Sequence, residues 1–164
     1  MSKHCTHSGN TSCTQPISEQ VSHILQQAER LCVSRNLRFT ESRRRILKLI
    51  CQSSQPVGAY RLLDELREDG VSAAPPTVYR ALDFLLENGL IHRLATNNTY
   101  LACAHPEKHH EGVFLVCSQC GNTQEVHTTG VMDSVKRNAR VYGFNVEHAA
   151  VEVTGYCERC GGTQ

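Results

Sequence analysis

Two copies of a Cys-x-x-Cys-Gly motif, separated by 35 residues, constrain the fold of this 164-residue chain more than any other feature. The first motif runs from Cys117 to Gly121 and the second from Cys157 to Gly161. In each motif two thiolates can converge on one metal ion, and the glycine allows the backbone turn that brings amide groups toward the sulfurs. Four thiolates form the closed tetrahedral shell typical of structural zinc. We therefore predict a structural zinc site made of Cys117, Cys120, Cys157 and Cys160.

The composition favours a metal over disulfide bonds as the use of the nine cysteines. The longest apolar run is the five residues from Val113 to Cys117, which is too short for a membrane span, and the polar start of the chain has no signal-peptide core. We therefore expect a cytoplasmic protein, whose thiols stay reduced. An odd number of cysteines also argues against a closed disulfide framework. Free core cysteines and a redox-active pair remain the alternatives to zinc.

The first part of the chain has the pattern of a winged helix-turn-helix domain, which we expect at residues 17–103. Thr40 is a suitable N-cap for a helix, and Pro75-Pro76 suits the first turn of another. Residues 90–94 and 99–103 have the pattern of two strands around a turn. Apolar residues recur at helical spacing in four segments, at about 18–32, 41–50, 59–69 and 75–88.

The second part, residues 104–164, has a mixed pattern. The whole chain is therefore expected to have an α+β fold, with the winged-helix domain followed by a small α/β domain that holds the four-cysteine site. The polar residues 1–16 are expected to form a disordered arm ahead of both domains. Strands are predicted at 113–117, 123–127 and 145–154, with a helix at 131–142.

The fourth predicted helix carries side chains suited to reading double-stranded DNA. Its polar face includes Thr77, Tyr79 and Arg80 near the N-terminal end, where a recognition helix meets the major groove. Arginine can form two hydrogen bonds to guanine, and Tyr60 at the start of the preceding helix could hold a phosphate. Residues 1–94 carry a net charge of +3 and the rest of the chain −2. This small difference also favours DNA binding by the first part of the chain. A solvated helix face is the alternative interpretation.

A second set of potential metal ligands is dispersed along the chain, and its mixture of imidazole, thiolate and carboxylate suits zinc. His92 and Cys103 lie on the two predicted wing strands, whereas His109, His110 and Glu125 belong to the second part. A metal ion bound across that boundary would fix the orientation of the two domains, which is the property that a switch needs. Spacing alone does not choose among these ligands. The full set is His92, Cys103, His105, His109, His110, Glu125, His127 and His148.

The order of these motifs over residues 20–162 resembles the Fur family of bacterial metal-responsive repressors. The resemblance rests on Leu37-Arg-Phe-Thr40, on Pro76-Thr-Val-Tyr-Arg80, on the wing, and on histidines ahead of the first cysteine motif. The run from Pro75 to Gly89, with Cys103 in the wing, is most similar to the zinc-sensing members. Within that pattern, counting back seven residues from Cys117 favours His110 over His109 as a ligand.

The resemblance assigns roles to individual residues. It implies DNA contacts at Tyr60, Tyr79 and Arg80, to which the helix pattern adds Thr77. It implies two zinc ions per subunit. The regulatory ligands would be His92, Cys103, His110 and Glu125, and the structural ligands Cys117, Cys120, Cys157 and Cys160.

The resemblance also implies a homodimer joined through the second domain. Its two recognition helices would lie in successive major grooves of a palindromic, AT-rich operator. With regulatory zinc bound, the dimer would repress zinc-uptake genes in the bacterial cytoplasm. A sensor of iron or peroxide is the alternative within the family, although a thiolate in the switch site favours zinc over iron.

A zinc-dependent hydrolase or deaminase is the rival from another class, with Glu125 as a general base. A deaminase needs His-x-Glu and Pro-Cys-x-x-Cys. In this chain Val116 precedes Cys117 and Tyr156 precedes Cys157, so neither Cys-x-x-Cys motif has the proline that a deaminase needs. We therefore expect no enzyme, no catalytic residues and no small-molecule substrate.

Overall fold

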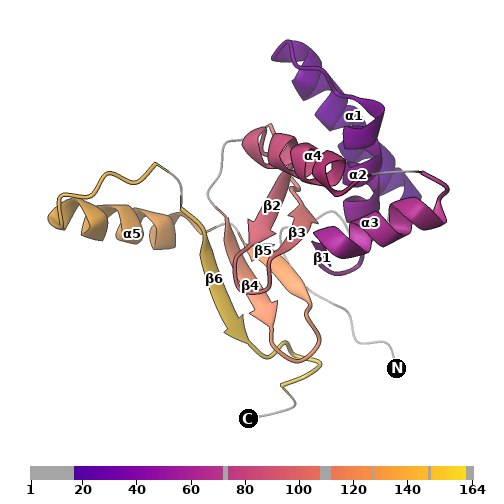
Figure 1. Cartoon of the computed structure of the whole chain (residues 1–164). Coiled ribbons are helices and arrows are strands. Elements are labelled where there is room, and N and C mark those ends of the chain that lie inside the picture. The colour runs from indigo at the N-terminus through magenta and orange to yellow at the C-terminus, as the bar shows by residue number, and fades with distance from the viewer. Residues whose placement is uncertain (1–16, 72–73, 108–111, 127, 148, 162–164) are drawn as a thin grey trace.

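Helices dominate the N-terminal part of the computed structural model, which describes residues 17–71, 74–107, 112–126, 128–147 and 149–161 (Figure 1). A small sheet, in the order β1-β3-β2, lies beside the helices and forms the wing. The helices are α1 (Ile17–Ser34), α2 (Glu41–Gln52), α3 (Ala59–Glu68) and α4 (Pro75–Glu87). The wing strands are β1 (Val57–Gly58), β2 (Ile91–Leu94) and β3 (Thr99–Ala102).

The helix ends follow the capping residues in the sequence. Thr40 is the N-cap of α2, where its hydroxyl oxygen accepts a hydrogen bond from the Arg43 amide at 3.5 Å. Pro75 opens α4, because proline lacks an N–H that the first helical turn would leave unpaired. Gly89 follows α4 with a φ of +68°, a conformation that glycine adopts without strain. The chain therefore turns sharply from α4 into the wing.

One apolar core joins the four helices to the wing. Leu47 of α2, Leu62 of α3 and Leu82 of α4 are fully buried in it, with Tyr100 of β3 at its edge. Burying a leucine side chain contributes about 1.5–3 kcal/mol. This core fixes the position of α4 relative to the wing.

Strand β1 was not predicted from the sequence. Its two residues, Val57 and Gly58, pair antiparallel with Tyr100 and Thr99 of β3. Two residues are too few to show the alternating pattern of a strand, so only the pairing with β3 defines it.

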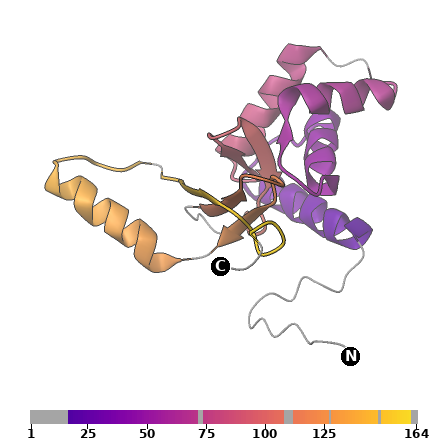
Figure 2. The ribbon, with the colours of Figure 1, turned by 90° about the horizontal axis from the view of Figure 1, so that it is seen from below.

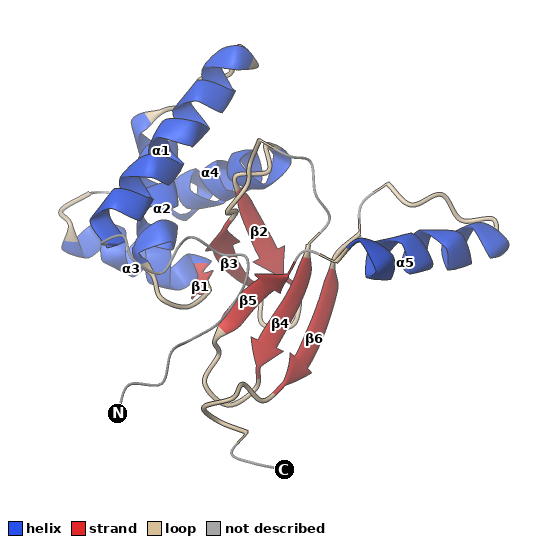
Figure 3. Ribbon diagram, turned by 180° about the vertical axis from the view of Figure 1, so that it is seen from behind, coloured by secondary structure: helices blue, strands red, loops and turns tan. Residues whose placement is uncertain are grey.

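The C-terminal part is a second three-stranded sheet with one helix (Figure 3). Its central strand β4 pairs antiparallel with β5 and parallel with β6. Together with the helical first part, this confirms the predicted α+β fold. The elements are β4 (Val113–Cys117), β5 (Thr123–Val126), α5 (Thr129–Val141) and β6 (Val151–Gly155).

The predicted strand at 145–154 is wrong over its first residues, because β6 begins only at Val151. Val151 is the register partner of Val113, the first residue of β4. A strand needs a partner for its backbone groups, and in the described part of the chain the pairing of β6 with β4 begins at Val151. The start of β4 therefore sets the start of β6.

Helix α5 lies away from the sheet and packs little against the rest of the chain (Figures 1 and 2). Several large apolar side chains on it and next to it are exposed. Tyr142, directly after the helix, is 87% exposed. The others are Val131, Val135, Val141 and Phe144.

Candidate metal centres and nucleic-acid interface

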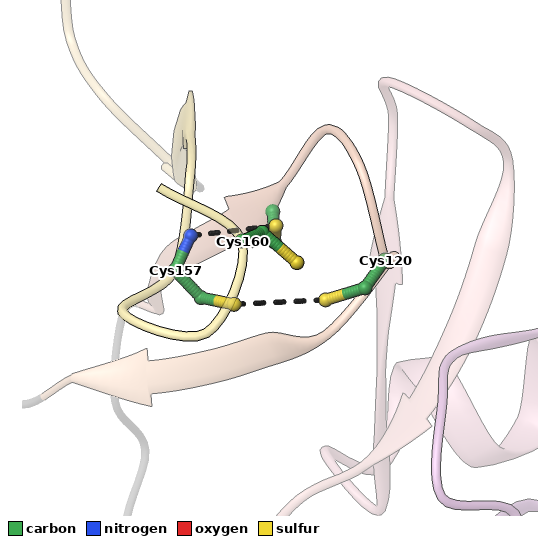
Figure 4. A group of neighbouring side chains, drawn as sticks. Cys120, Cys157 and Cys160 are labelled. Atoms are coloured by element: carbon green, nitrogen blue, oxygen red, sulfur yellow. Dashed lines mark hydrogen bonds between the residues drawn. The ribbon is translucent and has the colours of Figure 1, made fainter. Parts of the chain in front are cut away.

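Parallel pairing of β4 with β6 brings the two cysteine motifs together. Cys117 is the last residue of β4 and is the register partner of Gly155, the last residue of β6. The carboxyl ends of two parallel neighbours lie at one edge of a sheet, so the turns that follow them meet there. Cys120 follows β4 and Cys157 follows β6, which explains how motifs far apart in sequence become one cluster (Figure 4).

The cluster has the dimensions of a tetrahedral zinc site. The Sγ atoms of Cys117, Cys120, Cys157 and Cys160 all lie within 4.8 Å of one another. Those of Cys120 and Cys157 are 3.7 Å apart, and sulfurs at zinc–sulfur distances of about 2.3 Å in a tetrahedron are about 3.8 Å apart. The donor set and its spacing therefore fit zinc.

In each motif the glycine amide closes a turn onto the carbonyl of the first cysteine. The amide of Gly121 donates to the Cys117 carbonyl at 2.9 Å, and Gly121 has a φ of +69°. The amide of Gly161 donates to the Cys157 carbonyl at 2.7 Å. The Cys157 amide donates a hydrogen bond to Cys117 Sγ at 3.4 Å. The backbone of the second motif therefore faces a sulfur of the first.

The pKa values of Cys117 and Cys160 also fit a cation site. Amides of Cys120 and then Cys157 lower the pKa of Cys117 to about 6. The neighbouring sulfurs, first Cys120 and then Cys157, raise the pKa of Cys160 to about 12. Without a cation the first thiolate therefore forms readily and the last does not, whereas a divalent metal ion neutralises the accumulating charge. Four thiolates leave no open position on zinc, so its contribution when bound is structural.

The sequence reasoning missed one contact to this cluster. Gln55, between α2 and β1, donates through Nε2 to the carbonyl oxygen of Cys120 at 2.8 Å. This hydrogen bond links the segment between α2 and β1 to the first cysteine motif. A lone glutamine in a loop carries no pattern that would have revealed the contact.

The predicted regulatory ligands are brought together in part. Nε2 of His92, on β2, lies 3.4 Å from Oε1 of Glu125, on β5, and both side chains are largely buried. The His92 ring also lies 5.1 Å from the ring of Phe114 on β4. The wing and the second sheet therefore meet at His92.

Cys103 lies just after β3 and is fully buried. Burial raises the pKa of its thiol to about 12. A hydrogen bond from the His105 backbone lowers this pKa in part, and the negative charge of the Glu125 carboxylate raises it further. Among the described residues, only the four cysteines of the two motifs bring all their ligand atoms within 4.8 Å of one another. Cys103, His92 and Glu125 do not meet this spacing. His110 and its alternative His109 lie outside the described residues.

The predicted DNA-contacting side chains are exposed on two neighbouring helices. Tyr60 at the start of α3 is 77% exposed, and Tyr79 on α4 is 40% exposed. Thr77 and Arg80, also on α4, are exposed as well. These four side chains are free of the core on which their helices pack.

The arginines at 43–45 are engaged within the domain. Arg44 pairs with Glu29, and Arg45 Nη2 lies 3.2 Å from Asp69 Oδ2. The Arg43 guanidinium stacks 3.4 Å from the centre of the Phe84 ring. These contacts favour a role in packing α2 over a role in DNA binding.

None of the helices in the part of the chain that the structure describes has the length and apolar character that a membrane crossing requires.

Comparison with known proteins agrees with this geometry. A zinc uptake regulator complexed with zinc and DNA superposes with a TM-score of 0.82 at 39% identity, covering 86% of this chain and 95% of that one. Holo XcZur superposes with a TM-score of 0.80 at 40% identity, covering 87% of this chain and 99% of that one. Apo XcZur, at the same identity and with 88% and 99% covered, reaches a TM-score of only 0.52.

The sequence comparisons point the same way. The zinc uptake regulation protein of Escherichia coli (strain K12) is 40% identical over 138 residues, which make up 84% of this chain and 81% of that protein. The model of the ferric uptake regulator family matches residues 34–154. The chain therefore belongs to the ferric uptake regulator family, as its motifs predicted, and within that family it is similar to zinc uptake regulators.

Proposed function

We propose that this protein is a zinc-responsive transcriptional repressor that binds operator DNA as a homodimer when its regulatory zinc site is filled. The observation that carries the proposal is the contact between His92 of the wing and Glu125 of the second sheet, 3.4 Å apart. Both are predicted regulatory ligands, and they come from the two domains whose relative orientation a switch must control. The proposed activity is the regulation of zinc-uptake genes in the bacterial cytoplasm, without catalysis.

The regulatory site would act by joining the two domains. His92 and Cys103 would supply ligands from the wing side, and Glu125 and His110 from the C-terminal side. Zinc bound there supplies metal–ligand bonds that favour one domain arrangement over others. Shifting a two-state equilibrium from 1:99 to 99:1 needs about 5.5 kcal/mol of differential binding. Zinc-finger peptides gain about 10–16 kcal/mol from one structural zinc, so a second four-ligand site can supply that difference.

The overall arrangement supports this model. The chain is more similar to the zinc- and DNA-bound zinc uptake regulator and to holo XcZur than to apo XcZur. Since identity to the holo and apo forms of XcZur is the same, their different TM-scores reflect conformation rather than sequence. We infer that the arrangement with His92 beside Glu125 is the DNA-binding one.

Exposed side chains on α3 and α4 support operator recognition. Arg80 lies in the N-terminal half of α4, where it can reach a guanine edge, and the Tyr60 hydroxyl can reach a phosphate. The zinc uptake regulator of similar structure was solved with DNA. A palindromic, AT-rich operator is part of the proposal, because a two-fold dimer presents two such helices to related half-sites.

The exposed apolar residues of the C-terminal domain support a homodimer. Val135 of α5 is 39% exposed, Leu115 of β4 is 44% exposed and Val153 of β6 is 48% exposed. Apolar side chains gathered on one small domain in this way are typical of protein–protein interfaces. A second copy of the chain would cover them.

Selection of operator DNA tests the proposal directly. The purified protein is incubated with a pool of random-sequence DNA duplexes, with zinc in one arm and with a chelator that removes regulatory zinc in the other. Retained duplexes should carry a palindrome in the zinc arm only, and metal analysis should give two zinc ions per subunit there and one in the other arm. Retention of the same duplexes in both arms would contradict the zinc switch. Activation by iron(II) or by peroxide in place of zinc would favour the alternative sensors of the family.

A further inference from the structure

Three side chains on neighbouring strands of the C-terminal sheet form a row that faces the wing. Phe114 of β4 is the register partner of Glu125 on β5 and of Glu152 on β6. Register partners point to the same face of a sheet, so the three side chains lie side by side. Glu125 contacts His92 and Phe114 packs on the His92 ring.

Glu152 completes the row at its other end by binding the turn of the wing. Its Oε1 accepts a hydrogen bond from the Ala95 amide at 2.6 Å, and its Oε2 accepts one from the Thr96 amide at 3.1 Å. The Thr96 hydroxyl donates to the same Oε2 at 2.5 Å. One carboxylate therefore binds three donors, all of them immediately after β2.

These contacts favour the ionised carboxylate. Burial raises the pKa of Glu152, but the hydrogen bonds from the Thr96 hydroxyl and from the Ala95 and Thr96 amides outweigh it and hold the pKa below its usual range. Hydrogen bonds to a charged acceptor are about twice as strong as those between neutral groups.

The apolar cluster that the described residues form between wing and sheet is small. It consists of Leu94 and Leu101 from the wing strands and Phe114 and Val116 from β4. With so few apolar side chains, the polar contacts at the two ends of the row carry a large share of the domain orientation. One end holds the predicted zinc ligands His92 and Glu125, and the other holds Glu152.

We propose that Glu152 is a positioning residue that binds the wing turn to the C-terminal sheet independently of the metal and thereby sets the zinc concentration at which the switch responds. The proposal rests on the zinc-dependent DNA binding proposed above. If Glu152 favours the same arrangement as regulatory zinc, its loss lowers the population that is ready to bind zinc, and the apparent zinc affinity falls by the same factor. Saturating zinc restores the arrangement, so the maximal DNA affinity is kept.

The experiment measures operator binding by fluorescence anisotropy across buffered free zinc concentrations, with a labelled duplex carrying the sequence selected by the wild-type protein. Glu152→Ala removes the acceptor, and Thr96→Ala removes one donor from the opposite side. Glu147→Ala is the control, because it removes one exposed negative charge from the same domain. Zinc content and circular dichroism establish that each variant keeps its structural zinc and its fold.

The zinc midpoint of Glu152→Ala should rise by about tenfold, within the usual range of couplings between sites, with an unchanged plateau. Thr96→Ala should shift the midpoint less, and Glu147→Ala should match the wild type. In protein without regulatory zinc, hydrogen exchange of the wing turn at 95–96 should be faster in Glu152→Ala.

A wild-type midpoint in Glu152→Ala, in protein whose wild type does respond to zinc, would overturn the proposal while leaving the zinc switch intact. A lower melting temperature without a shift of the midpoint would likewise reduce Glu152 to a structural residue. No response to zinc in the wild type itself would overturn both the proposed function and this inference. If Glu152→Ala does not fold, the zinc midpoint of Thr96→Ala tests the proposal instead. A wild-type midpoint in that variant would overturn it.

Discussion

The Nε2 atom of His92 lies 3.4 Å from Oε1 of Glu125, across the junction between the wing and the C-terminal sheet. The two residues are far apart in the sequence, and each is held by a strand of its own sheet. Any ligand that binds both side chains must restrain both domains. Metal binding to both side chains would therefore be linked to the orientation of the two sheets.

Replacing a predicted regulatory ligand should uncouple zinc from DNA binding. His92→Ala and Cys103→Ser should each fold, form dimers and retain structural zinc, because neither residue belongs to the four-cysteine cluster. Zinc-dependent operator binding should be lost, since one ligand fewer weakens the zinc site that joins the domains. The effect is measured by electrophoretic mobility shift on protein whose structural zinc site is filled. Zinc for the regulatory site is added in one arm and left out in the other.

His23→Ala is the matched control for that experiment, because His23 is an exposed histidine on α1 that belongs to neither predicted zinc site. It should respond to zinc as the wild type does. A normal zinc response in His92→Ala would show that His92 is not a ligand.

Zinc activation should weaken as the pH falls. The pKa of Cys103 is raised to about 12, so its thiol is protonated over the whole physiological range and zinc must displace that proton. One displaced proton lowers the apparent affinity about tenfold per pH unit. Zinc titrations of operator binding between about pH 6 and 8 measure this slope, and a flat profile would count against a thiolate ligand.

Loss of one cysteine from the four-cysteine cluster should destabilise the C-terminal domain. Cys117→Ser should lose its structural zinc and at least about 3 kcal/mol of unfolding free energy, since structural zinc contributes about 10–16 kcal/mol in small peptides. Cys51→Ala, in α2 and outside the cluster, is the control that keeps the metal. Metal analysis and thermal melting test both variants. A full zinc complement and wild-type melting of Cys117→Ser would refute the structural site.

Arg80→Ala should change sequence discrimination without changing metal content. Arg80 is exposed on α4, so its removal leaves the core intact. Loss of an arginine that pairs with guanine lowers the preference for operator over unrelated DNA by about 1–3 kcal/mol. Arg67→Ala, an exposed arginine of α3 paired with Asp64 at 3.2 Å, should bind operator normally. Equal weakening on all DNA would instead make Arg80 a phosphate contact.

A charge on the exposed apolar face of α5 should break the dimer. Val135→Asp would bury a carboxylate in the proposed interface and should raise the dissociation constant of the dimer by about 100-fold or more. Val33→Asp, at a position on α1 that is 78% exposed, should remain dimeric. Light scattering after size-exclusion chromatography distinguishes the two. If the Val135→Asp and Val33→Asp variants had the same dimer dissociation constant, the interface would lie elsewhere.

Local patterns were sufficient for much of the fold. The helical spacing around Leu47, Leu62 and Leu82 predicted three helices, and Thr40 and Pro75 predicted where two of them begin. The Cys-x-x-Cys-Gly motifs likewise predicted the four-cysteine cluster. The helix positions and the turn within each cysteine motif depend on neighbours within a few residues, where backbone geometry and capping act directly.

Contacts between distant segments had no such pattern. Parallel pairing of β4 with β6 carries Cys117 and Cys157 to one edge of the sheet, and it also shortens the predicted strand at 145–154. The same register aligns Glu152 with Phe114 and Glu125, and so brings three residues from separate strands to the wing. A single glutamate such as Glu152 looks like any surface carboxylate in the sequence. Its role follows from the donors that the folded chain presents to it, because hydrogen bonds and strand register join residues across any distance along the chain.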